Sequence, residues 1–496
     1  MIKTRIPHAR THIRFIISRE YRKIRFAYVT MPSPKAAEAK PSAKRKNDSI
    51  SPPPLLKRKA QSSISKNAVA NFFTPTSQKS KERTNWSERA PDDDTPATLL
   101  VARYKPENAE GPEQRRRRKI AAFDLDSTLI TTASGKTHAN DPNDWKWWDS
   151  SVPTKLRQLY TEDDYRVVIL SNQAGLTLHP DPKSKAPKNL GKDRLANFKQ
   201  KCSAVLTKLD LPTAIYAATG KDIYRKPRPG MWRALCEDYN ISEADVDLEN
   251  SIFVGDAGGR TAQLKKGESG SATVKDFSCS DRNFAHNVGI TYKTPEEFFL
   301  CEKPREFTRD FDLANHPYPE HGEDGTGDII FEKKTKQEIV LFCGPPGGGK
   351  STFYWKYLKP LGYERVNQDT LKTRAKCFKA TGDLLNGGHS VAIDNTNPDP
   401  DGRAEWIKFA EKHKVPIRCV WFKASQELCE HNAAVRALNK PLNPEAREAL
   451  PKIAFSGFFS RFKEPKVKEG FGDVVEVEFK FRGTEAEYAI WGRYWN

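Results

Sequence analysis

Short apolar runs alternate with longer amphipathic stretches from about Thr98 to the C-terminus. The run that ends at Asp124 and the later runs "YRVVILSNQ", "TAIYAAT" and "SIFVGDAGG" have the length of buried strands. Helix-like segments such as 192–209 and 228–239 separate them, and a second series of the same kind starts at Glu338. Strand, helix, strand in this rhythm predicts an α/β fold with two doubly wound parallel-sheet domains.

Composition divides the chain into four parts. From Met31 to about Pro96 the chain is rich in Ser, Pro, Lys and Ala and poor in large apolar residues, which predicts disorder. The segment "HPYPEHGEDGTGD" is rich in Pro, Gly and acidic residues and is typical of a connection between domains. We therefore expect a disordered basic arm, a first domain, a linker and a second domain, at residues 1–97, 98–305, 306–334 and 335–496.

Positive charge is concentrated at the N-terminus. The 496 residues contain 83 Lys+Arg and 64 Asp+Glu, a net charge of +19, and residues 1–80 hold 18 of the basic residues but only Glu20, Glu38 and Asp48. A basic arm predicts an acidic polymer, a membrane surface or an import receptor as partner. The clusters 44–46 and 57–59 match a two-part nuclear import signal, the alternative being solvated charge in a tail. The chain is accordingly expected in the nucleus.

Two further features of the arm concern targeting and docking. Residues 1–30 combine arginines with Ile, Phe and Tyr, as in a mitochondrial presequence, unless translation starts at Met31 and they are not made. In "KNAVANFFTP", Val69, Phe72 and Phe73 resemble a sliding-clamp-binding box with Lys66 at the leading glutamine position. The alternative for this stretch is an incidental apolar spot.

The eight cysteines are scattered and form no Cys-x-x-Cys pair, which indicates reduced thiols of an intracellular protein, not a disulfide framework or a zinc site. No apolar run approaches the length needed to cross a bilayer, so no membrane partner is expected.

Two carboxylates follow the first apolar run. Asp124 and Asp126 alternate along the chain, so both are expected to point to one side at the carboxyl end of the sheet, where open α/β sheets bind ligands. One could attack phosphorus while the other protonates the leaving oxygen, with Mg²⁺ offsetting their repulsion of phosphate. A capping or turn role is the alternative. Ser171, Lys226 and Asp256 follow or precede later strands, where they could bind phosphate, neutralise a phosphoaspartate and complete the metal site.

This ordered set resembles the haloacid dehalogenase-like phosphatases over about residues 118–300. "DFSCSDRNFAHNVG" and "RKPRPGMW" are similar to the phosphatase domain of eukaryotic polynucleotide kinase 3′-phosphatases. The resemblance implies that Asp124 is the nucleophile and Asp126 the acid and base. It also implies a magnesium site at Asp124, Asp126 and Asp256, with Asp281 either supporting the metal or serving a turn.

A second phosphate-binding pattern, "GPPGGGKST", follows an apolar run and fits G-x-x-x-x-G-K-[ST]. Its glycines let backbone N–H groups close around the phosphates of ATP, its lysine reaches the β and γ oxygens, and its serine can hold Mg²⁺. The expected ATP-binding residues are Gly344, Gly347, Gly348, Gly349, Lys350, Ser351 and Thr352.

Three residues beyond this loop could complete the site, and a base among them would favour a kinase over an ATPase. Asp369 in "NQDT" could be that base and accept the proton of an attacking hydroxyl. Asp394 in "IDNTNPD" could hold a metal through its water or orient phosphate, and Arg436 could cover the transferring phosphate. These motifs resemble the kinase domain of the same bifunctional family, which implies that Asp369 is the general base and Arg436 a lid arginine. Where related lids often carry a second arginine, this chain has Ala433-Ala434.

Together the two sites predict an enzyme that removes 3′-phosphates and phosphorylates 5′-hydroxyls at DNA breaks, with Mg²⁺ and ATP. The alternatives are an enzyme of small metabolites, an RNA-repair enzyme and a scaffold with decayed sites. Trp145, Trp147 and Trp148 could support nucleic acid but are expected mostly in the core. Because the first hundred residues are predicted to be disordered, we expect no room in them for the phosphopeptide-binding domain that animal members of the resembled family carry.

Overall fold

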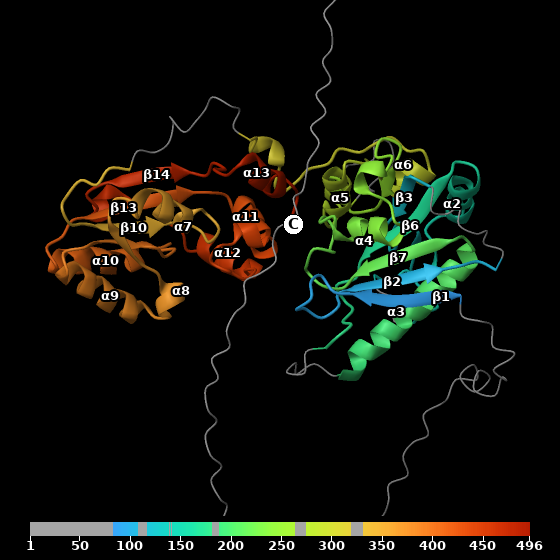
Figure 1. The fold of residues 1–496 in the computed structure, drawn as a ribbon, viewed down its shortest axis with the longest axis horizontal. Helices are drawn as coiled ribbons and strands as arrows, with labels where there is room; N and C mark the ends of the chain where they lie inside the picture. Colours follow the sequence, from blue (N-terminus) through green and yellow to red (C-terminus); the bar gives the residue numbers. More distant parts are fainter. Residues whose placement is uncertain are drawn as a thin grey trace, which may run out of the picture. The chain divides into compact units, whose positions relative to one another are not determined.

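The computed structural model describes residues 83–107, 117–137, 139, 141–180, 188–262, 274–318 and 331–496, without the side chains of 188–190. Two separate α/β sheets, each with helices on both faces, account for most of these residues (Figure 1). The expected fold class is confirmed. The predicted targeting signals and the docking motif at Val69, Phe72 and Phe73 lie outside the described residues.

The first sheet has seven strands in the order β1-β2-β7-β6-β3-β8-β9. From β7 to β9 all neighbouring strands are parallel, whereas β1 and β2 complete the sheet in antiparallel pairing. The strands are β1 (Thr84–Arg89), β2 (Leu99–Tyr104), β3 (Lys119–Phe123), β6 (Tyr165–Asn172), β7 (Thr213–Ala218), β8 (Ile252–Val254) and β9 (Thr291–Lys293). A separate hairpin pairs β4 (Ile130–Thr131) with β5 (Lys146–Trp147).

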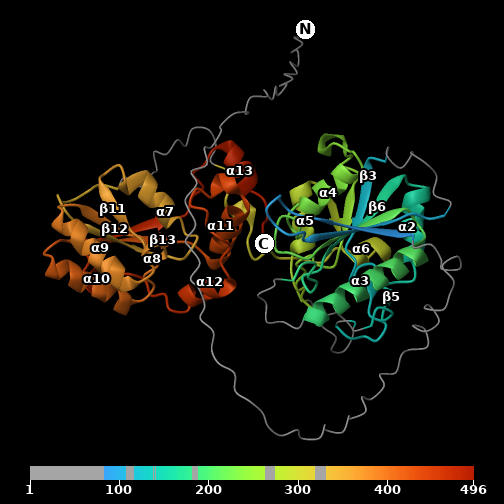
Figure 2. The same ribbon diagram turned by 60° about the horizontal axis from the view of Figure 1, so that its bottom comes forward.

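Helices cover both faces of this sheet because successive strand residues point to opposite sides. Leu100 packs in one core with α2, α3 and α6, and its neighbour Leu99 packs in the other with α4 and α5. Figure 2 shows α3 and α4 on opposite sides of the sheet. The helices are α2 (Val152–Thr161), α3 (Lys188–Leu209), α4 (Gly230–Asp238), α5 (Ser280–Val288) and α6 (Pro295–Phe299).

The first strand lies inside the segment that the sequence assigned to the disordered arm. All six residues of β1 pair with β2, from Thr84 opposite Tyr104 to Arg89 opposite Leu99. Arg89 also bonds Glu237 at 2.9 Å, and the Tyr224 hydroxyl donates to the Ala90 carbonyl at 2.7 Å. The expected start of order near Thr98 is therefore wrong. An edge strand of the sequence TNWSER buries few side chains, and its polarity hid it among the polar residues before it.

The second sheet is wholly parallel, in the order β11-β12-β10-β13-β14. One face packs on α9 and α10, and the other packs on α7 and the π-helical turn at Tyr354–Leu358. The strands are β10 (Ile339–Cys343), β11 (Tyr363–Val366), β12 (Ser390–Ile393), β13 (Ile417–Lys423) and β14 (Val474–Glu478). The helices are α7 (Lys350–Phe353), α8 (Gln368–Leu371), α9 (Arg374–Asn386), α10 (Pro400–Lys412), α11 (Gln426–Leu438), α12 (Lys452–Phe459) and α13 (Glu485–Trp491).

All eight cysteines fall within the described residues and are free thiols, as expected. Six are buried, Cys279 is half-buried and Cys301 is exposed. Within the described ranges, no helix has the length and apolar character to cross a membrane.

Candidate active sites

The carboxyl end of β3 places Asp124 and Asp126 in different surroundings. Asp124 directly follows β3, an interior strand, and its backbone N–H donates to the Val254 carbonyl at 2.9 Å. Its side chain is only 15% exposed. Asp126 is half-exposed, and its carboxylate accepts hydrogen bonds from Gln173 Nε2 at 2.7 Å and Lys201 Nζ at 3.0 Å. The buried carboxylate suits a nucleophile, and the solvated one suits proton exchange with water.

Lys226 is the cation of this site. Its Nζ lies 3.1 Å from Asp124 Oδ1 and 2.9 Å from Asp281 Oδ1. Burial alone would lower the pKa of Lys226, but the carboxylates of Asp124 and then Asp281 raise it. Asn172 fixes the backbone of Lys226 through two hydrogen bonds, at 2.9 and 3.0 Å. The ammonium is therefore held charged where a phosphoaspartate would form.

Three carboxylates form a cluster that fits a divalent cation. Oxygens of Asp124, Asp256 and Asp281 lie within 4.8 Å of one another. Burial raises the pKa of Asp256 to about 8, and the neighbouring Asp124 and Asp281 add to the shift. Burial likewise raises the pKa of Asp124 to about 6, against the pull of Lys226. One buried and two partly buried carboxylates facing one ammonium leave negative charge that a hard cation such as Mg²⁺ would neutralise. Asp126 is not in this cluster, so its role as a metal ligand stays a prediction.

Asp281 reaches the cluster from the first turn of α5 because Gly255 leaves room for it. A Cβ on Gly255 would lie 2.2 Å from Asp281 Oδ2. That oxygen also accepts a hydrogen bond from the Ala257 N–H at 3.2 Å. Asp281 is thus locked toward the other carboxylates and not into a solvent-exposed turn.

Ser171 lies at the end of β6, where it is almost fully buried. Its Oγ accepts a hydrogen bond from Gln173 Nε2 at 3.0 Å, so Gln173 links Ser171 to Asp126. Sequence reasoning missed Gln173 and Lys201 as partners of Asp126. Gln173 directly follows a predicted strand, which was a usable signal, whereas Lys201 lies in the middle of α3 and gave none.

The glycine-rich loop joins β10 to α7, as the motif requires. Gly347 and Gly349 have φ of +79° and +91°, and a Cβ on Gly347 would lie 2.5 Å from the Cys429 carbonyl oxygen. Lys350 is buried and donates to the carbonyl oxygens of Gly344 and Pro345, at 3.0 and 2.6 Å. Burial lowers the pKa of Lys350, an effect that the phosphates of a nucleotide would oppose.

Ser351, in the first turn of α7, meets Asp394, which directly follows β12. The Ser351 hydroxyl donates to Asp394 Oδ2 at 2.9 Å, and Asp394 is buried. A hydroxyl beside a carboxylate is a donor set that fits Mg²⁺ next to a nucleotide. Arg365 on β11 donates two hydrogen bonds here. Its Nε donates to the same Asp394 oxygen at 2.8 Å, and its Nη2 donates to Ser351 Oγ at 2.9 Å.

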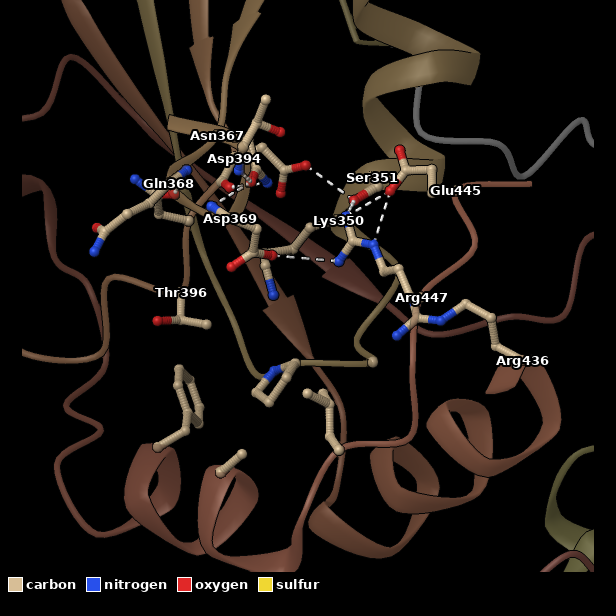
Figure 3. Close-up of a pocket in the computed structure, with 18 of the residues that line it drawn as sticks. Lys350, Ser351, Asn367, Gln368, Asp369, Asp394, Thr396, Arg436, Glu445 and Arg447 are labelled. Atoms are coloured by element: carbon tan, nitrogen blue, oxygen red, sulfur yellow. Dashed lines mark hydrogen bonds and ion pairs between the residues drawn. The ribbon is translucent and has the colours of Figure 1, made fainter. Parts of the chain in front are cut away.

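The loop opens into a cavity of about 1240 Å³. Asp369 lines it from α8, with its side chain 81% exposed, and Asn367 caps that helix by accepting from the Asp369 N–H at 2.7 Å. Arg436 lines the cavity from α11 (Figure 3). Of the loop residues in the predicted ATP site, Gly347, Gly349, Lys350, Ser351 and Thr352 line it, while Gly344 and Gly348 do not.

Three linked charged residues stand out among the cavity residues that were not expected. Arg365, Glu445 and Arg447 line it, and Glu445 joins the two arginines with bonds of 2.8 and 2.6 Å. Burial alone would raise the pKa of Glu445. Hydrogen bonds from Trp355, Arg365 and Arg447 outweigh this effect and lower the pKa to about 2. Glu445 and Arg447 follow the predicted lid helix without a motif of their own.

The tryptophan triplet is partly structural. Trp145, Trp147 and Trp148 are half-buried and pack against the core on the α3 face of the first sheet. Trp145 and Trp147 also pack edge to face, with ring centroids 5.4 Å apart. The expected core role is confirmed for the buried part of these rings.

Comparisons with known proteins match both halves of the chain. The family model described as polynucleotide kinase 3 phosphatase matches residues 119–299, and that of an AAA domain matches residues 339–465. A polynucleotide 3′-phosphatase of Arabidopsis thaliana is 30% identical over 193 residues, which are 37% of this chain and 24% of the plant protein. A bifunctional polynucleotide phosphatase/kinase of Schizosaccharomyces pombe is 36% identical over 442 residues, 86% of this chain and 97% of the yeast protein. The chain therefore belongs to the family of bifunctional polynucleotide phosphatase/kinases.

Proposed function

We propose that this protein heals DNA breaks by hydrolysing 3′-phosphates at the β3 site and phosphorylating 5′-hydroxyls with ATP at the β10 site. The observation that carries the proposal is the coexistence of two complete and different phosphate sites in one chain. The β3 site pairs a buried nucleophile with Lys226. The β10 site pairs a nucleotide loop with an open carboxylate, Asp369. A break with 3′-phosphate and 5′-hydroxyl ends needs both activities before it can be ligated.

At the β3 site, an oxygen of Asp124 attacks phosphorus and the bond from phosphorus to the 3′-oxygen breaks. Asp126 supplies the proton that the leaving 3′-oxygen takes, and Lys226 stabilises the phosphoaspartate. Asp126 then takes a proton from water, which attacks the same phosphorus and releases inorganic phosphate and Asp124. Asp124, Asp256 and Asp281 would hold Mg²⁺, whose charge offsets the repulsion between carboxylates and phosphate.

At the β10 site, the loop N–H groups and Lys350 hold the ATP phosphates. The 5′-oxygen attacks the γ-phosphorus, its proton passes to Asp369, and the bond to the bridging oxygen breaks so that ADP leaves with the electron pair. Arg436 lies in the cavity wall, where it can stabilise the equatorial oxygens. Ser351 and Asp394 would hold the Mg²⁺ that accompanies ATP.

A nicked DNA duplex with 3′-phosphate and 5′-hydroxyl ends tests the proposal. Wild type, Asp124→Asn and Asp369→Asn are incubated with Mg²⁺ and ATP, and the ends are separated by electrophoresis. We expect Asp124→Asn to phosphorylate the 5′-hydroxyl but to leave the 3′-phosphate in place. Asp369→Asn should remove the 3′-phosphate but leave the 5′-hydroxyl unphosphorylated. Unchanged DNA ends with wild type, together with turnover of RNA ends or of a sugar phosphate, would contradict the proposal.

We further propose a protein partner, a sliding clamp, for the N-terminal segment. We propose that Val69, Phe72 and Phe73 dock as a short apolar turn, which their spacing in a polar stretch supports. Phe72→Ala, Phe73→Ala protein should lose clamp binding in a titration with purified clamp. Equal binding of variant and wild type would overturn this step without affecting either enzymatic activity.

We propose nuclear localisation, together with a mitochondrial pool wherever residues 1–30 are translated. The basic clusters 44–46 and 57–59 support the first part, and the arginine-rich composition of residues 1–30 supports the second. Microscopy of fluorescent fusions starting at Met1 and at Met31 separates them. A Met31 fusion that stays out of the nucleus would contradict the first part.

A further inference from the structure

Arg447 lies between the two chemical ends of the kinase cavity. Its Nη2 lies 3.0 Å from Ser351 Oγ on the nucleotide loop, and its Nη1 lies 3.7 Å from Asp369 Oδ2 on the acceptor side. Figure 3 shows the guanidinium between these two residues, on a segment that follows the helix of Arg436. One side chain thus touches both the donor loop and the expected base.

This position places the Arg447 guanidinium beside the path of phosphoryl transfer. The γ-phosphorus must pass from an oxygen held by the loop to an oxygen beside Asp369, roughly in line. A guanidinium in contact with both Ser351 and Asp369 lies next to that path. Its planar set of N–H donors matches the equatorial oxygens that carry the charge of the transition state. We propose that Arg447 is a second catalytic arginine of the kinase, which binds the transferring phosphoryl group together with Arg436. The inference rests on the proposed kinase function.

The neighbouring charges favour an anion at this place. Burial, and then the charge of Arg447, lowers the pKa of Arg436, so the two guanidiniums repel each other across the cavity. Among the described residues, the buried Nε of Arg436 has no hydrogen-bond partner. A phosphoryl group between the two arginines would relieve the repulsion and satisfy this donor.

The backbone around Arg447 is held firmly enough to present the side chain. Asn443 Oδ1 accepts from the Arg447 N–H at 2.9 Å, and Asn443 Nδ2 donates to the Arg447 carbonyl at 2.8 Å. Glu445 fixes the guanidinium at 2.6 Å. Without substrate, the carboxylates of Glu445 and Asp369 occupy the donors that a phosphoryl group would take.

Arg447 gives the cavity a further arginine beside Arg436. The helix of Arg436 offers only Ala433 and Ala434 in the turn before it, and the arginine from the following segment lines the cavity. Arg365 is a poorer candidate. Its guanidinium is already engaged by Asp394, which is buried, and by Glu445.

The test compares Arg447→Gln and Arg447→Lys with wild type. Lys452→Ala is the control, because it removes a cation that is 91% exposed at the start of α12. Kinase kcat and KM are measured on a 5′-hydroxyl oligonucleotide, and phosphatase activity of the same samples reports folding. We expect Arg447→Gln to lower kcat about 10²- to 10³-fold with less than about a threefold change in KM for ATP. Arg447→Lys should recover only part of kcat, and Lys452→Ala should match wild type.

A binding measurement separates catalysis from a structural role. ADP with aluminium fluoride presents a planar mimic of the transferring phosphoryl group, whereas ADP alone does not. Arg447→Gln should weaken the mimic at least tenfold and leave ADP affinity unchanged in calorimetric titrations with Mg²⁺. Equal losses for both ligands, or a kcat within about threefold of wild type, would overturn the role of Arg447. Absence of kinase activity in wild type would instead overturn the proposed function.

Discussion

Lys226 and Asp281 form a buried ion pair, with Nζ and Oδ1 2.9 Å apart and each side chain only 1% exposed. Asp124 shares the same ammonium at 3.1 Å. Taking such a pair out of water can cost more in desolvation than the attraction returns, so a buried pair is weak evidence for stability. The third charged group here, Asp124, is the proposed nucleophile. The pair is therefore better explained by the chemistry at Asp124 than by stability.

Replacing Lys226 by Met should abolish the phosphatase and spare the kinase. The change leaves Asp124 and Asp281 facing each other without a cation, and breaking a buried pair costs about 3–5 kcal/mol of stability. We expect phosphatase kcat to fall by about 10³-fold or more, while 5′-phosphorylation of an oligonucleotide stays within about twofold of wild type. The phosphatase kcat of a matched Lys201→Met variant, which removes only a partner of the half-exposed Asp126, should fall less. Equal losses for the two variants would contradict a special role for Lys226.

The position of β1 predicts where the chain can be shortened. A protein of residues 83–496 keeps β1, whereas residues 98–496 lose six strand residues and the bonds of Arg89 and Ala90. The shorter protein exposes the edge of β2, so we expect poorer solubility and a phosphatase domain that melts at least about 5 °C lower. Differential scanning calorimetry checks this. Equal melting curves would show that β1 contributes nothing.

Two glycines of the nucleotide loop should differ in sensitivity. Gly347→Ala combines strain at φ +79° with a Cβ 2.5 Å from the Cys429 carbonyl oxygen. Gly349→Ala adds only the backbone strain of an L-residue at φ +91°, about 1–2 kcal/mol. No atom of the described residues lies within 4 Å of the added Cβ. We expect Gly347→Ala to lose ATP binding by calorimetric titration and Gly349→Ala to retain weakened binding. The reverse order would contradict this account of the loop.

His431 predicts acid sensitivity of the second domain. Burial lowers the pKa of His431 to about 3, and its ring lies 2.9 Å from the Trp491 carbonyl oxygen. The unfolded chain binds a proton below about pH 6.5 and the folded one does not, so stability is present above that pH and is lost as pH falls toward 3. At pH 5.5 the loss is about 1.4 kcal/mol. We expect His431→Gln to reduce the fall in Tm between pH 7.5 and 5.5 by about 3 °C. An unchanged fall would exclude His431 as its source.

Asp256 predicts that metal binding at the first site depends on pH. Because its pKa is raised to about 8, the carboxyl holds a proton below that pH, and a metal ion must displace it. Affinity for Mg²⁺ should therefore rise with pH between 6.5 and 8, by up to about tenfold per unit for one proton. Calorimetric titration in two buffers of different ionisation enthalpy counts the released protons. Asp256→Asn should lower that count, and an unchanged count would contradict the assignment. Removal of Mg²⁺ by EDTA should stop both activities.

Local sequence order predicted the parts of both sites that lie on one strand and its following loop. The loop ending in Lys350 and Ser351, and the strand ending at Asp124, depend on side chains only a few residues apart. The spacing fixes their placement because a parallel sheet brings the ends of its strands together. The strand pattern predicted both sheets for the same reason.

Contacts between distant segments could not be predicted in this way. Ser351 and Arg447 are 96 positions apart, and neither Arg447 nor Glu445 belongs to a repeating pattern. The partner of Asp126 on α3, Lys201, depends on the packing of a whole helix across the sheet. Such contacts are set by three-dimensional packing, which periodicity does not record.

The single exposed thiol among the eight cysteines gives the protein a practical property. Cys301 follows α6, while the buried thiols would react only as the domains open. A maleimide dye should therefore attach first at Cys301 of the native, unmutated enzyme, ahead of the half-buried Cys279, whose pKa burial raises to about 11. A labelled enzyme of this kind would allow fluorescence energy transfer to a dye on a broken duplex, and so report which end the protein engages first.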